Sequence, residues 1–236
     1  MFRRAQSGTK NIQASVMPLM AAKRRAPTRR RPARILEKQL VMLPSAETAS
    51  TTKSHATPKE KSRGWVIVYT GDGKGKTTAA LGIALRASGH NMKVCMIQFV
   101  KGSWFTGELK SSQLLAPNFE IVRAGKGFVG IIDDKKPFSE HVAAAKKAMR
   151  ESEKMISSGM YDIVILDEIN YAVNRKLIGI RSVLSLIRGR PANVTLVLTG
   201  RGAPRAIIDS ADLVTEMRKI KHPYEKGMTA RKGIDF

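Results

Sequence analysis

A glycine-rich segment ending in Lys-Thr-Thr carries the clearest chemistry in this sequence. Residues 69–78 read Tyr-Thr-Gly-Asp-Gly-Lys-Gly-Lys-Thr-Thr, between an apolar run at 65–68 and a helix-like segment. The glycines let successive backbone N–H groups face one anion, and the N-terminus of the next helix adds partial positive charge. Lys76 can reach the distal phosphates of a nucleotide, and Thr77 can ligate Mg²⁺. The predicted phosphate-binding residues are Gly71, Asp72, Gly73, Lys74, Gly75, Lys76, Thr77 and Thr78.

The first corner of this loop departs from the usual phosphate-loop spacing. That spacing has a glycine five residues before Gly75, where this chain has Thr70. Glycine-rich turns between a strand and a helix also occur without any ligand. The Gly-Lys-Thr-Thr ending in this context favours nucleotide binding over a plain turn.

Two adjacent carboxylates end a second apolar run. Residues 161–168 read Tyr-Asp-Ile-Val-Ile-Leu-Asp-Glu, a pattern typical of a buried parallel strand whose carboxyl end meets a ligand crevice. Asp167 is predicted to hold Mg²⁺ directly or through water, and Glu168 to help with the metal or to position a reactant. Alone, the pair would fit a solvent-facing strand end equally well. Behind a phosphate-binding loop, the ligand-binding interpretation is favoured.

The length and composition limit the class of protein. A chain of 236 residues has room for one α/β domain and an appendage. Its single cysteine, Cys95, excludes an intrachain disulfide, and the apolar residues around it favour a packed thiol over a nucleophile. No apolar run approaches the roughly 20 residues of a membrane helix. With no secretory signal pattern either, we expect a cytoplasmic protein that has no membrane partner.

The net charge of +23 is unevenly distributed. Residues 1–60 hold 13 Lys and Arg but only 3 Asp and Glu, with prolines and a Ser/Thr-rich run, and are predicted to form a disordered basic arm before a domain at 61–236. With no acid before Glu37, the arm resembles an organelle transit peptide, and it fits an extension from an upstream start codon equally well. A nucleic-acid tether is the third interpretation, because no interleaved aromatic residues are present to stack on bases. We therefore expect no nucleic-acid partner.

From residue 64 onward, apolar runs alternate with helical patterns. This alternation predicts a doubly wound α/β fold, with a mostly parallel sheet covered by helices on both faces. In the helix predicted at 139–157, Lys146, Lys147 and Arg150 are expected to form a solvated face. The predicted strands are 65–69, 93–99, 119–123, 163–166, 194–198 and 213–216, and the other predicted helices are 76–88, 107–115, 178–188 and 203–210.

Further polar clusters follow the predicted strands. Lys101, Trp104 and Glu108 come after the second strand and are expected near the same crevice edge. Arg201, in a Thr-Gly-Arg-Gly segment after the fifth strand, is expected to enter from the rim. The last 20 residues contain Lys-His-Pro and end in Gly-Ile-Asp-Phe.

Residues 64–236 closely resemble the corrinoid adenosyltransferases of the cobalamin pathway, a P-loop NTPase-like (RecA-like) family that includes cob(I)yrinic acid a,c-diamide adenosyltransferase. The resemblance includes the phosphate-binding loop, the Gln-Phe-x-Lys-Gly-x-Trp segment at 98–104 and the Leu-Asp-Glu strand end. It extends to Thr-Gly-Arg-Gly and to the tail from Lys-His to Gly-Ile-Asp-Phe. Together these segments are highly specific.

The resemblance implies transfer of the 5′-deoxyadenosyl group of ATP to a Co(I) corrinoid, with release of triphosphate, in adenosylcobalamin synthesis or salvage. Cobalt itself attacks the 5′ carbon, so the protein has to bring the two substrates in line. The family holds the nucleotide reversed, with the γ-phosphate where other P-loop enzymes hold the α-phosphate. Lys76 and Mg²⁺, with Mn²⁺ as an alternative, would neutralise charge on the leaving triphosphate.

The resemblance also implies residue roles and partners. The implied catalytic residues are Lys76, Glu168 and Phe128, and the implied metal ligands are Thr77, Asp167 and Glu168. Lys101, Trp104, Glu108 and Arg201 join the loop as binding residues. A flavoprotein reductase for the Co(II) corrinoid and a homodimer are expected, whereas the preferred corrinoid acceptor is not indicated.

The corrin side of the site departs from the family pattern. Family members commonly carry Gly-Phe-Thr-Trp where residues 127–130 read Gly-Phe-Val-Gly, so Phe128 carries over and the tryptophan does not. Phe128 either presses on the corrin or displaces a cobalt ligand, and a buried loop anchor is an equal interpretation. Core packing is an alternative role for Trp104. The histidines lack metal-ligand spacing, and for His222 a structural hydrogen bond is favoured over cobalt coordination.

Two other classes of enzyme remain open from the sequence. An ordinary P-loop ATPase or kinase would share the loop and the carboxylates, but would cleave ATP at the γ-phosphate rather than at the ribose. A nucleic-acid-stimulated ATPase of the same broad fold would fit the positive charge.

Overall fold

The computed structural model describes residues 63–236, apart from 103, 104, 130–133 and 135. The predicted basic arm at 1–60, Trp104 and Gly130 lie outside the described residues, so the predictions about them are not tested. Within the part that is described, no helix has both the length and the apolar character needed to cross a membrane.

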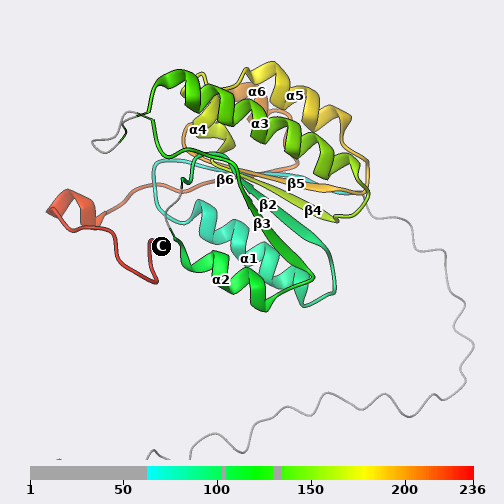
Figure 1. The fold of residues 1–236 in the computed structure, drawn as a ribbon, viewed down its shortest axis with the longest axis horizontal. Coiled ribbons are helices and arrows are strands. Elements are labelled where there is room, and N and C mark those ends of the chain that lie inside the picture. Colours follow the sequence, from blue (N-terminus) through cyan, green and yellow to red (C-terminus); the bar gives the residue numbers. More distant parts are fainter. Residues whose placement is uncertain (1–62, 103–104, 130–133, 135) are drawn as a thin grey trace, which may run out of the picture. The chain divides into compact units, whose positions relative to one another are not determined.

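Six strands form one parallel sheet in the order β3-β2-β4-β5-β1-β6 (Figure 1). Every residue of β2 and β4 is buried, which explains why these strands read as continuous apolar runs rather than alternating ones. All six predicted strands are confirmed, with ends that move by no more than one residue. The strands are β1 (Val66–Thr70), β2 (Val94–Gln98), β3 (Phe119–Arg123), β4 (Ile163–Asp167), β5 (Thr195–Thr199) and β6 (Leu213–Glu216).

Helices cover both faces of the sheet, which confirms the doubly wound prediction. On one face lie α1 (Lys76–Ser88) and α2 (Gly107–Leu114) (Figure 1). On the other lie α3 (Phe138–Ser157), α4 (Ile169–Asn174), α5 (Ile180–Gly189) and α6 (Arg205–Ile208). Alternate strand residues point to opposite faces, so the sheet has two apolar cores, one against the alanines of α1 and one against α3, α4 and α5.

Several helical segments differ from the prediction, among them α6, which is shorter than the predicted helix at 203–210. The short helix α4 was not expected, because it begins directly after the β4 carboxylates, where Glu168 reverses the chain in the left-handed region (φ 63°). A 3₁₀ helix, Pro223–Lys226, lies in the tail. The predicted helix at 178–188 begins later, at Ile180, because Gly179 before it has an extended backbone (φ −78°, ψ 139°).

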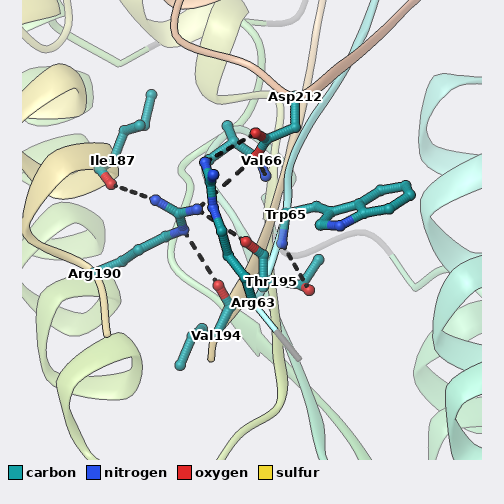
Figure 2. Close-up of polar contacts among 9 residues, drawn as sticks. Arg63, Trp65, Val66, Ile187, Arg190, Val194, Thr195 and Asp212 are labelled. Atoms are coloured by element: carbon teal, nitrogen blue, oxygen red, sulfur yellow. Dashed lines mark hydrogen bonds and ion pairs between the residues drawn. The ribbon is translucent and has the colours of Figure 1, made fainter. Parts of the chain in front are cut away.

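At the amino end of the sheet, Arg190 joins α5 to the strands (Figure 2). Its guanidinium donates hydrogen bonds to the carbonyl oxygens of Ile187 (3.0 Å), Val194 (3.2 Å) and Gly64 (3.0 Å). It also lies 3.9 Å from the Asp212 carboxylate. One side chain thereby binds carbonyl oxygens from three separate segments of the chain.

Asp212 completes this cluster from the start of β6. Its Oδ2 accepts the backbone N–H of Val66 at 2.7 Å, and its Oδ1 accepts from Arg63 at 3.1 Å. Beside it, the hydroxyl oxygen of Thr195 accepts the N–H of Trp65 at 3.2 Å (Figure 2). The starts of β1, β5 and β6 are therefore tied together by side chains.

Candidate nucleotide-binding site

The glycine-rich loop joins β1 to α1 at the carboxyl end of the sheet. Gly71 (φ 95°) and Gly75 (φ 119°) adopt backbone conformations that other residues rarely tolerate. A Cβ atom at Gly71 or Gly73 would overlap the backbone of Met217, because the segment after β6 runs against the loop. These glycines are therefore required by the packing of the loop against this segment.

Thr70 explains the atypical first corner of the loop. Its hydroxyl oxygen accepts the N–H of Ala203 at 2.9 Å, and its carbonyl oxygen accepts the N–H of Met217 at 2.9 Å. Where the usual spacing has glycine, this side chain ties the loop to the segment after β5.

The Lys76 side chain lies across the loop. It is 6% exposed, and its Nζ donates to the carbonyl oxygens of Gly71 (2.9 Å) and Gly73 (2.6 Å). Burial lowers the pKa of Lys76, and the charge of Glu168 opposes that shift. The amine therefore points to the centre of the predicted phosphate cradle.

Asp167 and Thr77 meet as the sequence predicts. Fully buried at the end of β4, Asp167 accepts hydrogen bonds at its Oδ1 from the hydroxyls of Thr77 and Thr199, both at 2.8 Å. Its Oδ2 has no partner among the described residues, which is unusual for a buried carboxylate oxygen. Burial raises the pKa of Asp167, and the charge of Lys101 and the two hydroxyls oppose the rise.

This arrangement fits a magnesium ion held jointly by protein and substrate. Within the described ranges, no three His, Cys, Asp or Glu side chains gather closely enough to hold a metal by themselves. Mg²⁺ commonly takes one or two protein ligands and completes its shell with water and substrate phosphates. A buried oxygen of Asp167 without a partner, beside the Thr77 hydroxyl, is a suitable donor pair.

Glu168 lies beside Asp167 in a strained backbone position. Its N–H donates to the hydroxyl oxygen of Thr199 at 2.9 Å. Burial, followed by the charge of Asp167, raises the pKa of Glu168 to about 7, while Lys76, Arg201 and Lys101 oppose the rise. These charged groups therefore belong to one electrostatic cluster.

Lys101 and Glu108 approach this cluster from the end of β2 and from α2. Their side chains form an ion pair, and the amide of Gln98 donates to the same Glu108 oxygen at 3.2 Å. Burial alone would raise the pKa of Glu108, but the hydrogen bond from Lys101 gives a net lowering. The structure thus brings the two predicted binding residues together.

Arg201 lies at the rim, where the sequence places it. The loop that carries it turns through positive φ at Gly200 and Gly202, and the amide of Asn174 donates to the carbonyl oxygens of Arg201 (2.9 Å) and Gly202 (2.7 Å). The exposed Arg201 side chain is close enough to influence the pKa of both Lys76 and Glu168.

Phe128 is supported by Tyr171, a residue that sequence reasoning missed. The two rings meet edge to face at a centroid distance of 5.4 Å, and the N–H of Val129 donates to the Tyr171 hydroxyl at 3.2 Å. Arg175 covers the Tyr171 ring. Phe128 remains 39% exposed, so it is held on one side and open on the other. The available signal was the position of Tyr171, three residues after Glu168.

The C-terminal tail returns to the loop, which was also not predicted. Asp72 accepts the N–H of Lys219 at 3.2 Å, and Lys74 forms an ion pair with Asp235. In the same tail, the ring Nδ1 of His222 accepts the N–H of Tyr224 at 3.2 Å, so the predicted structural hydrogen bond is confirmed.

Cys95 is fully buried, and burial with the neighbouring Glu120 raises its pKa to about 12. This confirms the predicted packed thiol.

Several known proteins similar to this chain are described as corrinoid adenosyltransferases. Residues 62–236 match the family model ATP:corrinoid adenosyltransferase BtuR/CobO/CobP. Corrinoid adenosyltransferase CobA of Salmonella typhimurium is 37% identical over 177 residues, covering 75% of this chain and 88% of that protein. The corrinoid adenosyltransferase of Escherichia coli strain K12 is 37% identical over 174 residues, covering 74% and 86%. Among solved structures, flagellar accessory protein FlaH of Methanocaldococcus jannaschii has a TM-score of 0.46 at 15% identity, covering 65% and 71%.

Proposed function

This chain belongs to the ATP:corrinoid adenosyltransferase family and transfers an adenosyl group from ATP to a corrinoid, and we propose that the acceptor is the Co(I) form, which attacks the 5′ carbon and releases triphosphate. The observation that carries the proposal is the placement of Lys76 across the loop, beside the buried Thr77–Asp167 pair. Family membership favours this reaction over the ATPase, kinase and nucleic-acid-stimulated alternatives.

The triphosphate would bind in the loop, with the γ-phosphate innermost. Lys76 would exchange its two carbonyl partners, Gly71 and Gly73, for phosphate oxygens. Because the amine already points into the cradle, little rearrangement is needed, and its charge is in place when the leaving group forms.

Thr77 and Asp167 would hold Mg²⁺, with Glu168 beside them. When bound, the ion supplies positive charge to the triphosphate leaving group. The protein contributes by fixing Asp167: two hydroxyls hold its Oδ1, which leaves Oδ2 free to accept a ligand. Lys101 and Arg201 add positive charge around the same oxygens.

On the acceptor side, the open face of Phe128 would contact the corrin. Its edge-to-face contact with Tyr171 fixes the ring without covering it. Holding the two substrates in line replaces the need for a protein nucleophile. We also propose a homodimer and a flavoprotein reductase that supplies the reduced corrinoid, both supported by the family resemblance alone.

The test is anaerobic incubation with Mg-ATP and chemically reduced cob(I)alamin. We expect the absorption spectrum to change to that of a light-sensitive adenosylcorrinoid, with one triphosphate formed for each corrinoid alkylated. Orthophosphate or ADP release without alkylation would contradict the proposal and indicate a conventional ATPase. The Lys76→Ala variant, lacking the amine at the cradle, serves as the inactive control.

A further inference from the structure

Gln98, at the end of β2, is a fully buried polar residue with an unused acceptor. Its Oε1 has no hydrogen-bond partner among the described residues. In the same part of the chain, the other buried side-chain atoms without a partner belong to Thr106, Asp167 and Asn170, which lie at or after the carboxyl ends of β2 and β4. A buried acceptor without a donor destabilises a folded chain, so its presence beside the nucleotide site points to a ligand.

Gln98 lies directly beside Asp167 on the sheet. The two residues are in register on the neighbouring strands β2 and β4, so their side chains lie on the same face. Two residues earlier on each strand, Met96 and Ile165 pack on that face with the alanines of α1. From the same face, Thr77 donates its hydroxyl hydrogen to Asp167. Gln98 therefore faces the nucleotide site and not the core on the other side of the sheet.

Glu108 sets the orientation of the Gln98 amide. The Nε2 of Gln98 donates to the Oε1 of Glu108 at 3.2 Å. Burial opposes ionisation of Glu108, but the hydrogen bond from Lys101 gives a net lowering of its pKa, so the carboxylate is ionised. An ionised carboxylate can only accept hydrogen bonds, and it therefore selects the amide nitrogen. The amide oxygen is turned away from Glu108 and is left for another donor.

The water shell of a metal ion would supply that donor. Neighbouring strands lie about 4.8 Å apart, a gap that one water molecule can span between acceptor oxygens on Gln98 and Asp167. Mg²⁺ keeps several waters when it binds through one or two protein ligands, and these waters donate hydrogen bonds outward. With Thr77 and Asp167 as the protein ligands, the Gln98 oxygen lies where such a water needs an acceptor.

We propose that Gln98 is a positioning residue for the metal, whose Oε1 accepts a hydrogen bond from a water bound to Mg²⁺ beside Asp167. The inference rests on the proposed function, because it takes Thr77 and Asp167 as the metal ligands. It also gives the Lys101–Glu108 pair a role, which is to hold the Gln98 amide in the orientation that the water requires. Replacing a group that orients a metal shell commonly lowers metal affinity by about 10- to 100-fold.

The test is calorimetric titration of the full-length protein with the β,γ-imido analogue of ATP, in Mg²⁺ and in EDTA. The readout is the Kd in EDTA divided by the Kd in Mg²⁺, which measures the coupling between metal and nucleotide. Gln98→Met removes the acceptor at nearly constant volume, so this ratio should fall about tenfold while the Kd in EDTA matches wild type. The Tm of the free protein should be unchanged or higher, because an unpaired buried acceptor is lost.

Two further variants and one control sharpen the result. Gln98→Glu keeps an acceptor and adds negative charge, so its ratio should stay at or above the wild-type value. Thr77→Val removes a proposed metal ligand and should lower the ratio at least as far as Gln98→Met does. Gln113→Met is the matched control, because it makes the same change at an exposed position of α2 and should leave both the ratio and the Tm unchanged.

A ratio that Gln98→Met leaves unchanged would overturn the proposal, and a lower Tm in that variant would then make Gln98 a structural residue. An equal rise of the Kd in EDTA and in Mg²⁺ would also overturn it, since the amide would then contact the nucleotide itself.

The outcomes separate this proposal from the proposed function. If Thr77→Val lowers the ratio and Gln98→Met does not, the assignment of Gln98 alone fails. If the wild-type Kd does not depend on Mg²⁺, the metal ligands and the role of Gln98 fail together. If the ratio falls as expected but the wild-type enzyme does not alkylate cob(I)alamin, the proposed reaction fails and the role of Gln98 stands.

Discussion

The two ends of the parallel sheet are built in opposite ways. At the amino end, Arg190 and Asp212 engage backbone groups from α5, β1 and the segment before β5 (Figure 2). At the carboxyl end, buried oxygens of Asp167 and Gln98 have no partner among the described residues, and Asp167 lies beside the carboxylate of Glu168. The amino-end cluster pairs its polar groups with the protein, whereas Asp167 Oδ2 and Gln98 Oε1 at the carboxyl end are left open to a ligand.

This difference separates stability from function along each strand. Buried polar atoms without partners and adjacent like charges destabilise a folded chain, so they persist where a ligand uses them. In the amino-end cluster, no buried polar side-chain atom lacks a partner among the described residues, and Asp212 lies between the guanidiniums of Arg63 and Arg190, so this end contributes mainly to holding the strands together. Substitutions at the carboxyl end should therefore reduce activity, whereas those at the amino end should reduce the free energy of unfolding.

The largest expected effect is that of Lys76→Ala at the carboxyl end. Removal of a preorganised positive group at the leaving triphosphate should lower kcat about 10²- to 10³-fold or more. Thermal unfolding should change little, because the amine contacts only loop carbonyls. Steady-state kinetics and a melting curve measure both quantities.

Lys93→Ala is the control at the opposite end. Lys93 precedes β2 and donates to Asn118 at 2.8 Å, so its loss should affect stability slightly and leave kcat unchanged. Near-normal turnover in Lys76→Ala would contradict the assignment of the cradle.

The next largest effect is that of Arg190→Met at the amino end. Three carbonyl oxygens lose their donor, so the free energy of unfolding should fall by about 3 kcal/mol. For a domain of this size, the Tm should drop by about 6–12 °C. At a temperature where the variant is folded, kcat should match wild type.

Arg188→Met provides the matched control, since Arg188 is exposed two residues earlier on α5 and should tolerate the change. Denaturant unfolding measures the difference. A variant that stays stable but loses activity would contradict the separation of the two ends.

The strands of the sheet and the main residues of the carboxyl-end site were predictable from the sequence. The six strands follow from apolar runs, and the meeting of Lys76, Thr77 and Asp167 follows from two motifs at the ends of parallel strands. Helix α4 was missed because six residues after a carboxylate pair show little periodicity, and its start depends on the positive φ of Glu168.

Contacts that depend on strand order were not predictable. The sequence does not say that β4 and β5 are neighbours, so the hydrogen bond from Thr199 to Asp167 could not be anticipated. The contact of Lys74 with Asp235 joins positions 161 residues apart, and no local pattern encodes it. Arg190 likewise gave no sign of its role, because its partners are main-chain carbonyls from separate segments.

Thr199 and Thr195, at opposite ends of β5, allow the comparison to be tested within one strand. Thr199→Val removes a donor to Asp167 and the acceptor for the Glu168 N–H, so both kcat and stability should fall, with kcat lower by about tenfold. Thr199→Ser keeps the hydroxyl and should restore most of the activity.

Thr195→Val removes only the acceptor for the Trp65 N–H and should leave kcat unchanged. Because Thr199 orients a proposed metal ligand, Thr199→Val should also raise the Mg²⁺ concentration needed for half-maximal activity. An unchanged Mg²⁺ requirement would assign Thr199 a structural role only.

The smallest effect is expected where the tail meets the loop. In Asp235→Asn the side chain keeps an acceptor for the Arg231 N–H but loses the charge that holds Lys74, so the lysine becomes available to a phosphate. The KM for ATP should fall by up to about threefold, the range of a partly exposed ion pair. Asp209→Asn removes a similar surface pair with Arg205 and should leave the KM unchanged. A higher KM in Asp235→Asn would mean that Asp235 positions Lys74 for the nucleotide, which would make the tail part of the carboxyl-end site.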